Sequence, residues 1–498
     1  MKNILLLFSI IALISCGKDT EKQSDSKSKN TPEEITKFEI STEPIAGKPD
    51  SNSKLSVQDL EYQVMYNRAF EAVIWSIPAV SMYRFRQAGL NLGLKDNQIM
   101  ANSGVAMPNN EAMMPNSSTS YIMALSDLRN GPTVLEVPES GDEGSLFGQI
   151  VNTWQYTIAD VGPSGLDKGH HSKYLITPPG YDKIIPKGYI HIPSSTYFVS
   201  FIFRSIPGPG KTVSDAHNYA KTLKMYAYSE EPNPKPTVFK DFTMSRFSSL
   251  PFYDERYFQD VYDLFSVEPI EEKDKMMMGK LKSIGIERGK PYNPTEKQLK
   301  AMKNAAVDAY YYMYSLWFNA DKSRYFWSDR QYVSQFLPDD NQSFTFEYDD
   351  KLDVDGRARA YFNTIYIPNK FTETPTNWYL APLADKDGND FIALKNYKVR
   401  VPANVPVAQF WALTIYDKET SAFIYTESNK TTISSFDKMK VNNDGSVDIY
   451  IGPTAPEGLE SNWIPTRDKI PYPLFRFYAA EEKLHNKTFK LPDFELIN

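Results

Sequence analysis

The feature that most constrains the fold of this chain is a set of short apolar runs that falls into two blocks. The first block covers residues 120–204, where Gly and Pro break the runs, and the second begins at Ser343, where apolar and polar residues alternate. Runs of this length and period are typical of β-strands, and their spacing resembles that of a sandwich. We therefore expect an α+β chain that is mainly β, with two β domains.

The individual strands follow from these runs. They are predicted at residues 121–125, 133–137, 174–176 and 197–202 in the first block, and at 344–346, 361–367, 398–401, 410–416, 447–451 and 474–478 in the second. The sequence Asn443-Asp444-Gly445-Ser446 stands between two of the later runs and is typical of a hairpin turn.

Helices are predicted before and between the two blocks. A capping-box-like start at Ser56 leads into a buried helix, in which Pro78 predicts a kink or an end. A second helix is expected at residues 214–228, and a helical region at 254–318, where Thr295 begins another capping box. A stripe of Met and aromatic residues from Leu299 onward has helical period, and we interpret it as packing.

The N-terminus has the pattern of an export signal. Lys2 precedes an apolar run that ends at Leu13-Ile14-Ser15-Cys16, and this run is too short to be a membrane-spanning helix. The pattern resembles the lipobox of bacterial lipoproteins, in which the chain is cut before the cysteine and the thiol carries a lipid. Cys16 is the one cysteine of the chain and the predicted lipidation site. Gly17 favours sorting to the outer membrane.

The domain boundaries are predicted from changes in composition. We expect a signal peptide at residues 1–15, a lipidated cysteine with a disordered tether at 16–54, an N-terminal helix with a β domain at 55–235, a helical connection at 236–325 and a second β domain at 326–498. The tether is rich in charged residues, Ser and Thr and has too little apolar surface to fold. The net charge of −7 disfavours a nucleic-acid partner.

Several motifs resemble a known family. In the first half these are Asn116 to Tyr121, Asp127-Leu128 and Ser195-Thr196 leading to Arg204; in the second half they are Phe410-Trp411-Ala412-Leu413-Thr414-Ile415-Tyr416-Asp417, Asn462-Trp463-Ile464-Pro465 and Arg476 with Tyr478. They resemble the bacterial, commonly exported family in which domain of unknown function 1254 precedes domain of unknown function 1214. The resemblance implies two β-sandwich, jelly-roll-like domains with helical segments at the N-terminus and between them. It implies no established reaction.

One position departs from the family pattern. Family members usually carry Asn-x-Asp-Thr-x-Tyr, whereas this chain has Ser118 between Asn116 and Thr119, so no carboxylate stands there. Any function that used this carboxylate is in doubt here.

Metal and catalytic motifs give weak signals. The chain has five histidines, none in a zinc-binding pair at helical spacing, and lacks the short motifs of hydrolases, NTPases and dehydrogenases. We predict no cofactor and leave the catalytic residues unassigned. Asp385, Asp387 and Asn389 resemble the opening of a calcium loop, although the same residues are ordinary turn formers.

Two groups of residues are candidate ligand contacts. Arg357 and Arg359 are expected on one side of a strand, where they either bind an anionic group or pair with surface acids. The second group combines aromatic and polar side chains, namely Trp411, Tyr416, Asp417, Asn462, Trp463 and Arg476. They suit stacking on a sugar ring, and they equally suit a sandwich core with Asn462 in a buried turn.

These features favour a cell-envelope lipoprotein, held at the membrane by its N-terminal lipid, that binds a small molecule or glycan in a cleft of its β domains. Two alternatives stay open. The first is a carbohydrate- or ester-active hydrolase or lyase with Asp and Glu as acid and base, and the second is an envelope assembly or structural factor. The sequence gives no oligomeric state.

Overall fold

The computed structural model describes residue 49 and residues 51–365 and 377–497. The chain divides into two units, Met1–Lys54 and Leu55–Asn498, and the fold described below is that of the second unit. Cys16, the predicted lipidation site, lies outside the described residues.

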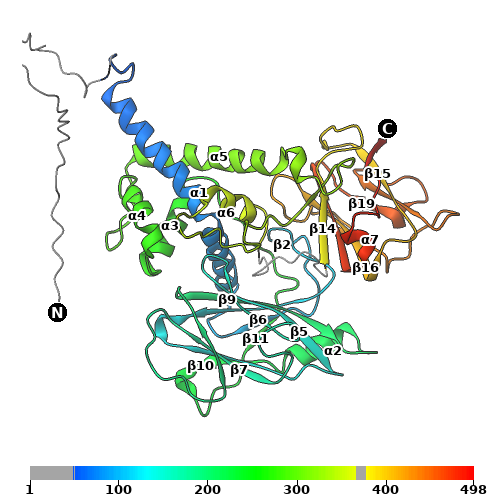
Figure 1. Cartoon of the computed structure of the whole chain (residues 1–498), viewed down its shortest axis with the longest axis horizontal. Helices are drawn as coiled ribbons and strands as arrows, with labels where there is room; N and C mark the ends of the chain where they lie inside the picture. Colours follow the sequence, from blue (N-terminus) through cyan, green and yellow to red (C-terminus); the bar gives the residue numbers. More distant parts are fainter. Residues whose placement is uncertain (1–48, 50, 366–376, 498) are drawn as a thin grey trace, which may run out of the picture. The chain divides into compact units, whose positions relative to one another are not determined.

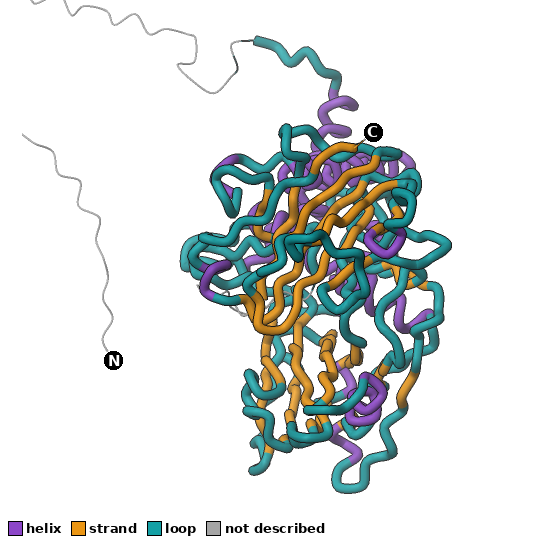
Figure 2. The backbone as a smooth tube through the Cα atoms, turned by 90° about the vertical axis from the view of Figure 1, so that its right-hand side faces the viewer, coloured by secondary structure: helices purple, strands orange, loops and turns teal. Residues whose placement is uncertain are grey.

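The first β domain is a sandwich of two sheets (Figures 1 and 2). The six-stranded sheet has the order β11 (Phe239–Lys240), β1 (Ile99–Ala101), β3 (Tyr121–Asp127), β9 (Phe198–Pro207), β5 (Gly144–Asn152) and β6 (Thr157–Val161). The four-stranded sheet has the order β10 (Lys224–Ala227), β4 (Thr133–Val137), β7 (Ser172–Thr177) and β8 (Tyr189–Pro193). Leu146, Phe201 and Tyr174 belong to the core that the two sheets enclose. Helix α2 (Val213–Ala220) adds Tyr219 to this core.

The second β domain is also a sandwich. Its five-stranded sheet has the order β13 (Tyr332–Ser334), β14 (Asn377–Pro382), β20 (Pro471–Ala480), β16 (Val407–Asp417) and β17 (Thr432–Ser434). Its four-stranded sheet has the order β19 (Trp463–Pro465), β18 (Val447–Gly452), β15 (Asn396–Val401) and β21 (Glu495–Ile497). Leu413, Ile449 and Phe475 belong to the enclosed core. A short helix, α7 (Glu482–His485), follows β20, and the strands β2 (Asn110–Glu111) and β12 (Phe247–Ser248) form a separate pair.

A helical layer has a core of its own. It consists of α1 (Val57–Asn91), α3 (Arg256–Val267), α4 (Lys275–Lys282), α5 (Glu296–Phe318) and α6 (Val354–Tyr361). Figure 1 shows α5 beside α1, and Trp75, Met302 and Trp317 are buried in the same apolar cluster. In the described part of the chain, no helix has the length and apolar character needed to cross a membrane. The α+β, mainly β class with two sandwiches and helices before and between them is therefore confirmed.

Helix α1 begins as predicted and continues further than expected. Ser56 accepts a hydrogen bond from the Asp59 amide in a full capping box. Of the kink or end predicted at Pro78, the end does not occur, because the helix continues to Asn91. The Pro78 carbonyl accepts a hydrogen bond from the Gln155 side chain at 2.9 Å, and the surrounding turns are buried. Tertiary packing thus holds the helix together across the proline.

Three other segments differ from the sequence prediction. The helix expected at 214–228 ends at Ala220, and residues 224–227 form β10, in which Tyr226 pairs with Val134 of β4. Residues 344–346 form no strand. Residues 354–361 form helix α6 because the Asp353 side chain accepts from the Gly356 amide and caps the helix. The turn at 443–446 is present, although the strands on its two sides do not pair with each other.

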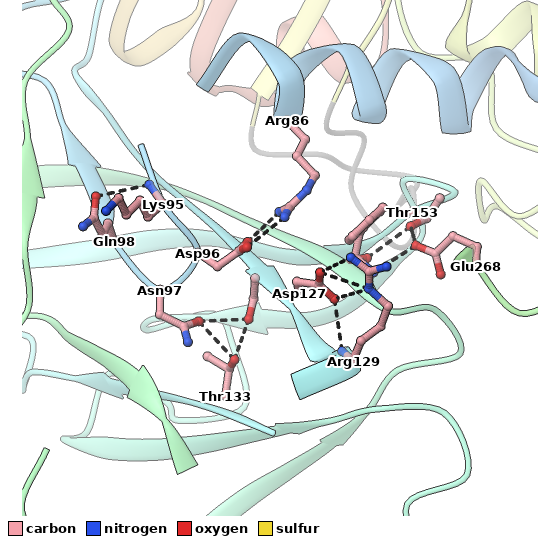
Figure 3. A network of polar contacts seen from close by, with 12 residues as sticks. Arg86, Lys95, Asp96, Asn97, Gln98, Asp127, Arg129, Thr133, Thr153 and Glu268 are labelled. Atoms are coloured by element: carbon pink, nitrogen blue, oxygen red, sulfur yellow. Dashed lines mark hydrogen bonds and ion pairs between the residues drawn. The ribbon is translucent and has the colours of Figure 1, made fainter. Parts of the chain in front are cut away.

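Charged side chains are compensated where α1 meets the first sandwich (Figure 3). Arg86 forms an ion pair with Asp96 at 2.7 Å, and Arg129 forms one with Asp127 at 2.6 Å. Burial raises the pKa of Glu268, whose carboxylate accepts a hydrogen bond from Thr153 at 2.5 Å. Each charged group in this network therefore has a partner, as buried charges generally require.

Candidate functional site

The candidate site lies where the outer faces of two sheets come together. On the six-stranded sheet, Tyr121 of β3 stands directly opposite Arg204 of β9. On the five-stranded sheet, Arg476 of β20 stands between Tyr379 of β14 and Ala412 of β16. Successive strand residues point to opposite faces, so Arg476 points away from the core residues Phe475 and Phe477, on the sheet's outer face.

The segment before β3 lies on the outer face of the five-stranded sheet and joins the two sandwiches. The Tyr416 hydroxyl donates to the Pro115 carbonyl at 2.7 Å, and the Asn116 side-chain amide donates to the Tyr478 hydroxyl at 2.9 Å. The hydroxyls of Ser117 and Thr432 also form a hydrogen bond, at 2.7 Å. These bonds hold the segment that carries the family-like Asn-x-x-Thr-x-Tyr pattern against the second sandwich.

The Arg476 guanidinium is buried among hydroxyl groups. Its side chain donates to Thr414 Oγ1 at 2.8 Å and to the Tyr416 hydroxyl at 2.5 Å. The Arg476 Cζ atom also lies 5.5 Å from the ring centre of Tyr379. The residue is 3 % exposed, and its Nε atom is buried without a hydrogen-bond partner.

The Arg204 guanidinium approaches the same place from the first sandwich. It donates to Thr119 Oγ1 at 3.2 Å and to the Tyr121 hydroxyl at 3.4 Å, and its Cζ atom lies 5.1 Å from the Tyr121 ring centre. Arg476 donates to the same segment at the Met114 carbonyl, at 3.5 Å, and its charge disfavours that of Arg204. Arg204, Tyr121 and Tyr379 are only partly buried, so the site is not sealed from solvent.

We call this group the boundary cluster, and its members are Arg204, Arg476, Tyr121, Tyr379, Tyr416 and Tyr478. Among the described residues, no carboxylate forms an ion pair with either arginine, and tyrosines are the neighbours that favour their charge. The cluster therefore differs from the compensated network at the end of α1.

The protonation states follow from burial. Burial raises the pKa of Tyr416 to about 12 in spite of the neighbouring Arg476, and it raises the pKa of Tyr379 above its usual range. Burial lowers the pKa of each arginine, but the charge of the tyrosine oxygens, which is present only at high pH, outweighs this effect, and the pKa of Arg204 and of Arg476 is raised. At neutral pH Tyr416 and Tyr379 are neutral hydrogen-bonding groups, and both arginines are cations.

Two of the residues selected from the sequence meet in the boundary cluster, Tyr416 and Arg476. Trp411 and Asp417 lie on β16, the strand that carries Tyr416, but their side chains are not part of the cluster. Trp411 faces the sandwich core and is 6 % exposed. Asp417 forms an ion pair with Lys469 at 3.1 Å and accepts from a backbone amide in the turn after β16.

Asn462 and Trp463 hold backbone groups. The Asn462 side chain accepts from the Lys440 amide at 2.8 Å and donates to the carbonyls of Lys440 and Asp448 at 2.8 and 2.9 Å. The Trp463 indole donates to the Gly452 carbonyl at 3.0 Å. Their polar groups are therefore engaged in turns, away from the hydroxyls of the boundary cluster.

Arg357 and Arg359 do not form a pair, because they lie on helix α6 and not on a strand. Residues two positions apart on a helix point in directions about 160° apart. Arg357 is fully buried and donates to the Tyr156 hydroxyl and the Trp75 carbonyl, both at 2.9 Å. It belongs to the helical core. Arg359 is partly buried on another side of the helix.

Residues 385–389, for which the sequence allowed a turn or a calcium loop, form a tight turn. One carboxylate oxygen of Asp385 accepts from the backbone amides of Asp387 and Asn389 at 3.0 and 2.9 Å. Within residues 51–365 and 377–497, His, Cys, Asp and Glu form no group of three that could hold a metal ion.

Two surface hollows lie away from the boundary cluster. One, of about 320 Å³, is lined by residues that include His171, Lys173 and Tyr189. The other, of about 390 Å³, lies between α1 and α5 beside Tyr66 and Asp308. Lys173 forms an ion pair with Glu231, and Tyr66 donates to Asp308. The polar groups of these hollows are thus already paired, and the boundary cluster is the stronger candidate.

Sequence reasoning missed Arg204, Tyr121, Tyr379 and Tyr478 as candidate site residues. Three of them, Arg204, Tyr121 and Tyr478, belong to the family-like motifs. The strand prediction for β3 and β9 did not reveal that Tyr121 and Arg204 face the other sandwich.

The fold and the site together define a protein of two β-sandwiches with an arginine and tyrosine cluster at the domain boundary. The family comparison agrees, since the model described as protein of unknown function DUF1254 matches residues 97–227 and that of DUF1214 matches residues 376–482. The chain therefore belongs to the proteins that carry a DUF1254 domain followed by a DUF1214 domain. No curated protein matches it in sequence.

One of two similar solved structures supports the fold. The VPA0106 protein from Vibrio parahaemolyticus is similar with a TM-score of 0.52 and 17% identity, over 87% of this chain and 100% of that chain. An uncharacterised protein from Burkholderia cenocepacia is similar with a TM-score of 0.37 and 10% identity, over 88% of this chain and 96% of that chain. At this level of identity, the likeness to the Vibrio protein speaks for the fold alone.

Proposed function

We propose that this chain is a lipid-anchored protein of the bacterial cell envelope that binds a small polar molecule or glycan at the boundary cluster. The observation that carries the proposal is the buried side chain of Arg476, which has a free Nε donor and no acidic partner among the described residues. Buried polar groups without partners are uncommon in folded proteins and are often explained by a missing ligand or by water.

The chemistry of the cluster suits binding. The tyrosine rings offer flat apolar faces, and their hydroxyls both donate and accept hydrogen bonds. Sites for small molecules commonly combine aromatic walls with a few converging polar groups at a boundary between domains. Tyr121, Arg204, Tyr379 and Arg476 come from two sheets of two different sandwiches, which matches this description.

The hydrolase alternative has less support at this site. Hydrolysis of a glycoside requires two carboxyl groups on either side of the scissile bond. Among the described residues, no Asp or Glu forms an ion pair with Arg204 or Arg476, and the groups with the largest effect on their charges are tyrosines. The cluster therefore favours binding over acid and base catalysis.

The binding proposal is tested by titrating the intact protein with neutral and acidic glycans from envelopes and plant cell walls. Calorimetry is a more suitable signal than tryptophan fluorescence because Trp378, the neighbour of Tyr379 in β14, packs against the sandwich core on the opposite face of the strand. A saturable change that Arg476→Met abolishes supports the proposal. The absence of any change across the panel, together with unchanged melting temperatures, contradicts it.

The location is tested separately. Envelope fractions from cells that express the wild type or Cys16→Ser are compared by mass spectrometry. A lipid-modified N-terminal cysteine in the wild type, with release of the variant into the soluble fraction, supports the anchor. An unmodified thiol or an uncleaved leader in the native envelope overturns it.

A further inference from the structure

The boundary cluster contains two positive charges that the described part of the protein does not neutralise. The chain carries 62 Asp and Glu residues against 55 Lys and Arg, so acidic partners are plentiful. Near the end of α1, acidic side chains neutralise two arginines, since Arg86 pairs with Asp96 and Arg129 pairs with Asp127. At the boundary cluster, in contrast, the side-chain acceptors are hydroxyls, since Arg204 donates to Thr119 and Arg476 donates to Thr414 and Tyr416.

The tyrosines do not take the place of the missing anion. The Tyr416 hydroxyl donates its proton to the Pro115 carbonyl and accepts a hydrogen bond from Arg476. It is therefore a neutral phenol in its observed contacts. A neutral oxygen satisfies a guanidinium donor geometrically but leaves its charge uncompensated, which is costly in a partly desolvated place.

The segment before β3 contacts Arg204 with a neutral group. Thr119 accepts a hydrogen bond from Arg204 with its hydroxyl, at 3.2 Å. In this chain the covering segment thus brings neutral oxygen atoms to the cluster.

We propose that the ligand of the boundary cluster carries an oxyanion group, and that this carboxylate, phosphate or sulfate binds between Arg204 and Arg476. The inference rests on the proposed binding function and specifies its ligand class. Guanidinium groups bind such oxyanions with short, charge-assisted hydrogen bonds and fixed geometry. The tyrosine hydroxyls are then available for the uncharged part of the ligand.

Three sugars that differ at one carbon atom test the inference. Glucose, glucuronate and glucose 6-phosphate are titrated into the full-length protein, with inorganic phosphate and sulfate as further probes, and binding is followed by calorimetry and by the shift of the melting temperature. We expect the two charged sugars to bind at least about tenfold more tightly than glucose, because a hydrogen bond to a charged group contributes more than a neutral one. We also expect their affinity to fall as salt is added.

Substitutions of the two arginines test whether the preference for charged sugars arises from the boundary cluster. Arg204→Met and Arg476→Met each remove one charge from it, and we expect each to reduce the preference for the charged sugars. Arg400→Met is the matched control, because Arg400 lies on β15 and forms an exposed ion pair with Asp448. If one cluster variant fails to fold, the other still decides the question.

Each outcome has a distinct meaning. Binding of the charged sugars, lost in the cluster variants and kept in Arg400→Met, supports the inference. Binding of inorganic phosphate or sulfate alone supports the oxyanion class and excludes the sugar as its carrier. Equal binding of glucose and glucuronate, or binding of neutral glycans only, overturns the inference and leaves the proposed function in place. If neither the charged probes nor the glycan panel bind, the proposed function fails as well.

Discussion

Arg204 of the first sandwich and Arg476 of the second donate to the same segment, Arg204 to Thr119 at 3.2 Å and Arg476 to the Met114 carbonyl at 3.5 Å, and the charge of Arg476 disfavours that of Arg204. At neutral pH, where Tyr416 and Tyr379 carry no charge, two like charges without a counter-ion lower the stability of the free protein. Proteins often retain unfavourable local interactions of this kind where a ligand binds. We therefore expect that replacing one of these arginines raises the stability of the free protein and weakens ligand binding.

The first prediction concerns the free protein. Arg204→Met removes one of the two like charges and keeps an apolar stem of similar length. We expect the free energy of unfolding, measured in urea without ligand, to rise by about 1 kcal/mol. Arg400→Met, which removes an exposed ion pair, should not increase stability. A marked loss of stability in Arg204→Met would show that the arginine is a structural residue.

The second prediction supplies the missing counter-ion. Thr119 contacts Arg204 at 3.2 Å, so Thr119→Asp places a carboxylate next to the guanidinium. We expect a higher melting temperature without ligand and weaker binding of glucuronate, because the new carboxylate competes for the same donors. Thr119→Asn has a similar shape and no charge and serves as the control. Equal effects of the two substitutions would contradict the electrostatic explanation.

The third prediction separates a structural arginine from the cluster. Arg357 is buried in the helical core, where it donates to Tyr156 and to the Trp75 carbonyl and lies over the Trp154 ring. Arg357→Ala leaves both acceptors without this donor and opens a cavity, so we expect the free energy of unfolding to fall by about 3 kcal/mol. Ligand affinity at the boundary cluster should be unchanged at temperatures where the variant is folded.

The fourth prediction concerns pH. Burial raises the pKa of Asp260 to about 6, and the nearby Arg84 lowers it only in part. The folded state therefore binds a proton more readily than the unfolded state, in which the pKa is close to 3.8. The contribution of Asp260 is most favourable at low pH, and up to about 3 kcal/mol of it is lost as the pH rises from about 4 to about 6.

Asp260→Asn isolates this effect. The free energy of unfolding of the variant and of the wild type is measured at several pH values between 4 and 7. The other carboxyl groups titrate in both proteins, so the difference between the two curves reports Asp260. A difference that stays constant over this range would show that Asp260 does not titrate there.

The class of the fold could be predicted because the period and the length of the apolar runs are properties of the local sequence. Strands such as β3 and β9 and the capped start of α1 at Ser56 were found in this way. Helix α6 was missed because the period-two interpretation of residues 355–361 gave no weight to Asp353, whose side chain caps the helix. Strand β10 was missed because its pairing with β4 depends on residues far away in the chain.

Part of the candidate site was also predicted, because some of its residues lie in motifs that are visible in the local sequence. Tyr416 and Arg476 were selected because aromatic and polar groups occur together in family-like motifs, and the fold brings them into contact. Asn462 was selected on the same grounds, but its amide satisfies three backbone groups in a turn. The role of Arg204 depends on two sheet faces that meet, and no local pattern in the sequence contains this information.

Helix α1 is an uninterrupted element of 35 residues and is therefore about 52 Å long. Its first turns are exposed at Val57, Leu60 and Val64, whereas its later turns contact the helical layer and its last residues reach the six-stranded sheet. A dye or surface linker attached near Val57 would thus sit on a rigid rod, several turns distant from either sandwich core. A measurement of the dye's orientation on the immobilised protein would then report the direction of the axis of helix α1, with little contribution from loop motion.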